Sequence, residues 1–271
     1  MTNQPLFYKN PIPLLKDRHA NSGVTSVENF AFAKGSNTIP VNFPEFMQLA
    51  KYYPIVFSSN DSPVPLVVTG LDNNKNVFIN NSGAWEDGFY VPAYIRRYPF
   101  AFTSAPVSDS DQLILCVDED SDRFVAQAKK THLRFFEKDL EATTTLQNIL
   151  RFCEQYHRDN IATGAFCKKL NDMGLLVERK ISLGLGDGAA PAELYGFKTI
   201  DEEKFNNLDV KILQEWHQQG VLGFIYFHIM SGGNWRNLVE RHLKQTRKTK
   251  KVVAQTSVKK VVKAAPTKKK K

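Results

Sequence analysis

The hydrophobic pattern of this chain changes its period near residue 140. Before that point, β-branched and aromatic runs alternate with turn-rich segments, which predicts strands at 55–59, 65–71, 76–80, 101–106 and 112–117. From Leu140 onward, apolar residues recur every three or four positions, as in helices that pack on a core. We therefore expect an α+β protein whose antiparallel, strand-rich N-terminal half packs against C-terminal helices.

Local start and stop signals divide these halves further. The segment 43–54 has Pro44 at its first helical position and Pro54 at its end, which predicts a short helix. Further elements are expected as follows: a helix over 146–153, a helix capped by Thr163 and ended by Gly174, strands at 175–183 and 194–200, a helix capped by Asn207 and ended by Gly220, and a last helix over 235–242.

Charge is distributed unevenly along the chain. Residues 244–271 carry 12 of the 36 basic residues and no acidic one, so residues 1–243 hold 24 basic against 28 acidic groups. The tail also lacks aromatic residues and cannot bury enough apolar surface to offset its chain entropy. We expect a globular domain over 1–243 and a disordered, lysine-rich tail over 244–271.

The sequence predicts a soluble, cytoplasmic protein without cofactor or metal. Its three cysteines are widely spaced among apolar neighbours, as expected of buried reduced thiols. No cleavable secretion signal is visible at the N-terminus, and the longest apolar run, 221–230, is too short for a membrane span. The acidic run 118–122 starts like a calcium loop, but Arg123 stands where that loop requires glycine.

The segment YVPAYIRRYPF, residues 90–100, concentrates aromatic bulk and charge. Pro92 suits the start of a helical turn, with Tyr94 on the side that anchors it and Arg96 and Arg97 on the other. Two guanidinium groups on a rigid turn suit a carboxylate, a phosphate or an acidic partner surface. The alternative is that both arginines form internal ion pairs, for instance with residues 118–122.

A weaker anion site is predicted where the last helix starts. Ser231 or Asn234 caps this helix, the neighbouring glycines leave its N–H groups approachable, and Arg236 adds a positive charge. Ordinary helix capping explains the same residues.

Taken in order, several segments resemble the SapC family of bacterial proteins, named for a component associated with surface layers. They are FAFAKGSNTIPV, FPEFMQLAKYYPIVFS, GFYVPAYIRRYPF, LCVDEDSDRF, TGAFCKKLNDMGLLVE and the closing stretch from LYGFKTI to VERH. The resemblance spans about residues 28 to 243 and excludes the tail. It implies a link with cell-surface components or peptides and supplies no catalytic residues.

Three functions follow from these observations. The first is a non-enzymatic accessory or binding protein whose site comprises Tyr94, Arg96, Arg97 and Trp85, with the indole presented by the turn GAWEDG to an acidic protein or peptide. In that case, replacing both arginines by alanine weakens binding and leaves folding intact.

The second function is an enzyme whose site assembles only in three dimensions, from His228, Asp187 or Arg97. The third is nonspecific, salt-sensitive association of the tail, residues 244–271, with nucleic acid or an anionic surface.

Overall fold

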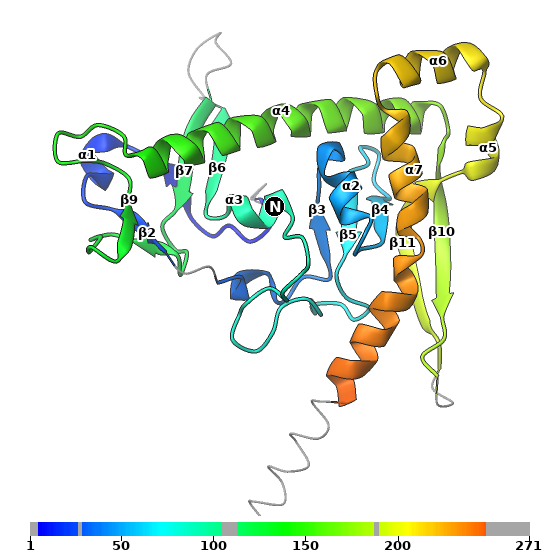
Figure 1. Cartoon of the computed structure of the whole chain (residues 1–271), viewed down its shortest axis with the longest axis horizontal. Coiled ribbons are helices and arrows are strands. Elements are labelled where there is room, and N and C mark those ends of the chain that lie inside the picture. Colours follow the sequence, from blue (N-terminus) through cyan, green and yellow to red (C-terminus); the bar gives the residue numbers. More distant parts are fainter. Residues whose placement is uncertain (1–4, 27–28, 105–112, 187–189, 248–271) are drawn as a thin grey trace, which may run out of the picture.

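A long helix, α4 (Thr144–Asp172), extends along three antiparallel sheets in the computed structural model of the protein (Figure 1). The structure describes residues 5–26, 29–104, 113–186 and 190–247. Strands dominate the N-terminal half and helices the C-terminal half, which confirms the α+β prediction.

The largest sheet has five strands in the order β10–β11–β4–β5–β3. These strands are Leu176–Leu183, Ala192–Ile200, Ile55–Ser58, Pro65–Val68 and Thr38–Pro40, respectively. Helix α7 (Leu222–Ser231) packs against β4, β11 and the short helix α2 (Phe46–Leu49). These contacts bury Ile225 in the main hydrophobic core, whereas Tyr226 and Met230 on the same helix are exposed.

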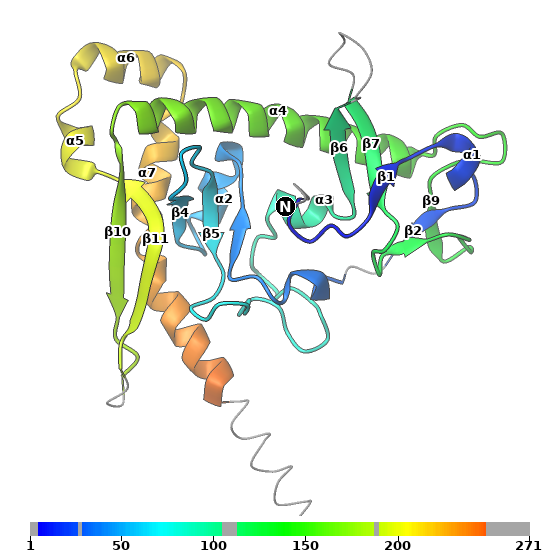
Figure 2. The same ribbon diagram turned by 180° about the vertical axis from the view of Figure 1, so that it is seen from behind.

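Two three-stranded sheets lie towards the other end of α4 (Figure 2). One has the order β1–β7–β6, formed by Pro11–Pro13, Leu113–Asp118 and Phe100–Ser104. The other has the order β8–β2–β9, formed by Phe124–Val125, Gly23–Thr25 and His132–Arg134. Gly23 permits the close pairing of β2 and β9, because a Cβ atom there would lie 2.3 Å from the carbonyl oxygen of Leu133.

The helices of the C-terminal half differ from the prediction at two places. One helix, α4 (Thr144–Asp172), stands where two were predicted, because no residue between Cys153 and Thr163 interrupts helical geometry. The Thr163 hydroxyl accepts a hydrogen bond from the Phe43 N–H and caps nothing; Thr143 caps α4. Asn207 follows α5 (Glu202–Asn206), and α6 (Val210–Gln218) is capped by Asp209.

The strand predicted at 76–80 is also wrong. The side chain of Asn76 accepts a hydrogen bond from the Phe78 N–H and thereby folds the segment into a turn. Only Ile79 forms a bridge, to Trp85.

The remaining short helices connect these elements. They are α1 (Lys16–His19), the 3₁₀ turns η1 (Ala31–Ala33) and η2 (Phe43–Glu45), and α3 (Ala93–Arg97). In both views α3 lies between the five-stranded sheet and the β1–β7–β6 sheet, beside α4 (Figures 1 and 2).

Helical structure continues after α7, over residues 234–247. The boundary predicted at residue 243 falls inside this helix, where the side-chain amide of Gln245 donates to the Val77 carbonyl at 3.0 Å. The remainder of the predicted tail, 248–271, lies outside the described residues.

Candidate anion-binding site

Helix α3 is held at its first residue by a buried carboxylate. The Glu45 side chain accepts hydrogen bonds from the Ala93 N–H at 2.6 Å and from the Tyr90 hydroxyl at 3.0 Å. Ile95 anchors the helix in the core, and Tyr98 leaves it in an extended conformation, as Pro99 requires. These constraints fix the direction in which Arg96 and Arg97 leave the helix.

The guanidinium group of Arg97 packs against three tyrosine rings. Its central carbon lies 4.3 Å from the ring centre of Tyr156, 4.9 Å from Tyr94 and 5.7 Å from Tyr8. The Nε atom is buried without a hydrogen-bond partner. Among the described residues, no carboxylate forms an ion pair with Arg97. Cation–π contacts of this kind contribute about 0.5–2 kcal/mol each, less than a buried charge costs.

The groups around Arg97 are uncharged at neutral pH. Burial raises the pKa of Tyr8, Tyr94 and Tyr156, although Arg97 itself lowers each of these values. Burial likewise raises the pKa of the Cys153 thiol to about 12. Within the described part of the chain, the positive charge of Arg97 is therefore not compensated by a negative one.

Arg96 has a different environment. Its Nη2 atom donates to the Tyr90 hydroxyl at 2.8 Å and lies 4.0 Å from the Glu45 carboxylate. Its side chain is 41% exposed, and its guanidinium carbon lies 5.1 Å from the ring centre of Phe152. The predicted ion pairs between these two arginines and the acidic run 118–122 are not formed. Asp118 instead accepts hydrogen bonds from the main-chain N–H groups of Lys9 and Asn10.

Both arginines line a cavity of about 420 Å³, which we call the arginine cleft. A third arginine, Arg123, also lines it and donates to the Tyr98 carbonyl at 2.9 Å. Its lining consists of Val24, Arg96, Arg97, Tyr98, Phe100, Arg123, Leu133, Thr145, Asn148, Ile149, Phe152 and Cys153. Five of these residues come from one face of α4, at the helical spacing of three and four. Among the residues that the structure describes, no acidic side chain lines the arginine cleft.

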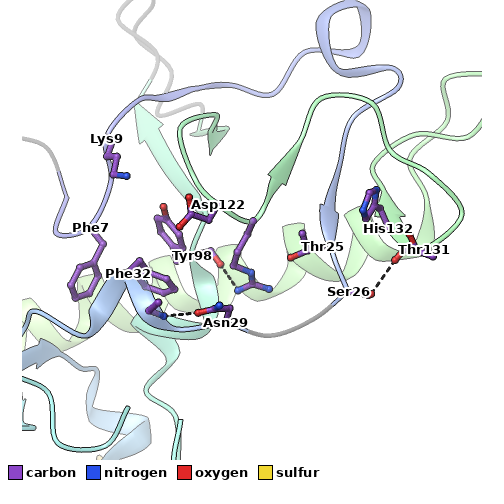
Figure 3. Close-up of a pocket in the computed structure, with 12 residues that line it drawn as sticks. Phe7, Lys9, Thr25, Ser26, Asn29, Phe32, Tyr98, Asp122, Thr131 and His132 are labelled. Atoms are coloured by element: carbon purple, nitrogen blue, oxygen red, sulfur yellow. Dashed lines mark hydrogen bonds between the residues drawn. The ribbon is translucent and has the colours of Figure 1, made fainter. Parts of the chain in front are cut away.

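A second cavity, of about 600 Å³, adjoins the arginine cleft and shares Tyr98 and Arg123 with it (Figure 3). Phe32 stacks on Tyr98 at one end, with ring centres 4.0 Å apart, and Ser26 and His132 lie at the other end. Because Asp122 also lines this cavity, its charge is mixed. The arginine cleft is therefore the better match to an anion.

The structure separates the other predicted site residues from this cleft. Tyr94 is buried and donates to the Leu6 carbonyl. Trp85 is only 5% exposed and donates to the Tyr53 hydroxyl, so the expectation that its turn presents the indole is wrong.

The predicted anion site at the last helix has its polar atoms engaged elsewhere. Ser231 is buried and accepts from the Ile55 N–H, and the Asn234 amide donates to the Ala50 carbonyl. Arg236 is exposed and pairs with Glu240 at 3.5 Å. Hydrogen bonds to strand β4 and to the end of α2 thus account for the two buried side chains.

The residues proposed for an enzyme do not meet at the cleft. His228 lies in the core of the C-terminal half, where its Nε2 atom accepts a hydrogen bond from the Ile200 N–H. Asp187 lies outside the described residues. In the described segments, no three acidic, histidine or cysteine side chains gather as metal ligands, and no helix is long and apolar enough to cross a bilayer.

Sequence reasoning missed Tyr8, Arg123, Tyr156 and Cys153 as neighbours of Arg97. The sequence does contain a signal for Tyr156. This residue lies three positions after Cys153 and therefore continues the apolar stripe of the same helix. Tyr8 and Arg123 come from distant segments, and no local pattern connects them with Arg97.

A scan against protein families matches the family described as SapC over residues 14–238. No curated protein and no solved structure matches the chain.

Proposed function

This chain belongs to the SapC family, and we propose that it is a non-enzymatic binding protein whose arginine cleft holds an oxyanion of its ligand. The proposal depends on one observation about the described residues: the charge of Arg97 is uncompensated, in a cavity that two more of their arginines and none of their acids line. Arginine is suited to this role, since its planar fork matches carboxylate and phosphate groups.

An oxyanion in the cleft would supply the negative charge that Arg97 lacks. Arg97 is half-buried, and removing a cation from water costs free energy unless a partner compensates it. The tyrosine rings offset part of this cost. The buried Nε atom has no hydrogen-bond partner, so the described part of the chain leaves this donor unsatisfied.

The side chains of the cleft support binding better than catalysis. Cys153 is its one thiol, and a pKa of about 12 keeps it protonated and unreactive at neutral pH. In the described part of the chain, the cleft lining contains no carboxylate or imidazole that would serve as a general base.

Nuclear magnetic resonance of the arginine side chains tests the proposal. The full chain, labelled with ¹⁵N, is titrated with sodium acetate and with sodium phosphate while the Nε–H signals are followed. The Arg97 signal, assigned from its loss in Arg97→Lys, should move with saturation as the anion binds.

Arg158 provides the matched control. It lies exposed on the same helix, α4, and contacts Gln155, which does not line the cleft. If the Arg97 signal moves no more than that of Arg158 with either anion, the arginine cleft is not an anion site and the proposed function is wrong.

A further inference from the structure

The arginine cleft has an apolar part as well as its cationic one. Ile149 and Phe152 are half-buried on its α4 side, and Leu133, on β9, is 42% exposed. These side chains remain in contact with water in the free protein. A ligand that covers them gains free energy in proportion to the apolar area removed from water.

Uncharged hydrogen-bonding side chains are scarce in the cleft. Apart from the three arginines and Tyr98, Thr145 and Asn148 are the described lining residues with side-chain oxygen or nitrogen atoms. The side-chain oxygen of Asn148 already accepts a hydrogen bond from Arg151. A bound peptide or sugar would bury amide or hydroxyl groups that need partners. An aliphatic chain has no such requirement.

We infer that the ligand of the arginine cleft is an aliphatic chain that ends in an oxyanion, with the oxyanion at Arg97 and the chain along Ile149, Phe152 and Leu133. This inference rests on the proposed function and specifies its ligand class. The cavity volume of about 420 Å³ lies in the range of small-molecule sites. A carboxylate and a phosphate monoester share this chemistry, and the experiment below compares them.

Calorimetric titration of the full chain tests the inference with a chain-length series. The probes are acetate, hexanoate, octanoate and decanoate, together with decyl phosphate and decanol, all below the concentrations at which micelles form. Affinity should increase by up to about fourfold per added methylene until the cavity is filled. The preferred head group is whichever of decanoate and decyl phosphate binds more tightly, and decanol should bind at least tenfold more weakly than both.

A pair of variants locates the chain. Ile149→Thr should reduce decanoate affinity about fivefold without changing acetate binding, because the apolar ethyl branch that contacts the chain is replaced by a smaller, polar hydroxyl. Ile161→Thr is the control, since Ile161 lies exposed on the same helix and does not line the cleft.

The outcomes separate this inference from the proposed function. Equal affinity for acetate and decanoate, with both lost in Arg97→Met, overturns the inference and leaves the proposed function intact. Decanol binding as tightly as decanoate overturns both, because the cleft would then be purely apolar. Equal effects of Ile149→Thr and Ile161→Thr would place the chain elsewhere and also overturn the inference.

Discussion

Two arginines in different regions of this protein pack against aromatic rings in similar ways. Arg241, in the C-terminal helix, lies 4.0 Å from the ring centre of Phe89 and 4.7 Å from that of Phe78. It also forms an ion pair of 2.8 Å with Glu86. Arg97 has the aromatic contacts without the ion pair.

This difference teaches how structural and binding arginines are distinguished. Arg241 has its charge, hydrogen bonds and ring contacts satisfied within the chain, and its neighbouring cavity contains both acidic and basic side chains. Arg97 lies against a cavity whose charged side chains, among the described residues, are all basic. Packing against aromatic rings does not distinguish Arg97 from Arg241. The presence or absence of a carboxylate partner does.

The largest expected effect concerns His228, which is buried and would become an uncompensated cation if it were protonated. Burial lowers its pKa from 6.5 to about 4. The unfolded chain therefore binds this proton as pH falls below about 6.5, whereas the folded chain does not until about pH 4. The unfolding free energy should decrease by about 3 kcal/mol across this window on account of His228.

Urea denaturation between pH 7 and pH 4 measures this effect. His228→Leu should show a correspondingly weaker pH dependence, and the exposed His217→Asn should match the wild type. Identical pH profiles for wild type and His228→Leu would show that the C-terminal core accommodates a buried cation after all.

A smaller loss is expected when the compensated arginine is removed. Arg241→Met should lower the unfolding free energy by about 1–2 kcal/mol, because Glu86, 38% exposed, loses its partner. Chemical denaturation checks this, with Arg236→Met as control, since the pair of Arg236 and Glu240 is highly exposed. No loss in Arg241→Met would remove the distinction between the two arginines.

Removing the uncompensated arginine should change stability least. In the absence of anion, Arg97→Met should differ from the wild type by less than about 1 kcal/mol or be more stable, because methionine retains the ring contacts without a buried charge. The same denaturation experiment measures it. A loss above about 3 kcal/mol would identify Arg97 as a structural residue.

Arg96 should affect ligand affinity weakly. It is more exposed than Arg97 and lies near the Glu45 carboxylate, so its charge is partly compensated. Arg96→Met should weaken decanoate binding about threefold, as measured by calorimetry, against a loss of at least about thirtyfold for Arg97→Met. Equal losses would assign the oxyanion to both residues.

The sequence predicted those features that depend on neighbouring residues. Pro92 and Pro99 correctly indicated where α3 starts and ends, and the glycine at 174 correctly ended α4. Two errors arose where side chains compete with the local pattern, at Asn76, which forms a turn, and at Thr163, which bonds to a distant main-chain N–H. Such competition is decided by tertiary contacts.

The site was predicted only in part for the same reason. Arg96 and Arg97 were identified because they are adjacent within one motif. Among the described residues, Arg97 has no carboxylate partner. This depends on how α4, the N-terminal segment and the 118–123 turn pack together. No sequence pattern encodes that arrangement locally.

The most direct test compares the cost of removing each arginine with and without ligand. Unfolding free energies are measured for wild type, Arg97→Met and Arg241→Met, in the absence of ligand and with decanoate at about one hundred times its dissociation constant for the wild type. Ligand should stabilise wild type and Arg241→Met by about 2.7 kcal/mol each, and Arg97→Met by about 2 kcal/mol less. Equal stabilisation of all three proteins would contradict the account, because Arg97 would then have no part in holding the anion.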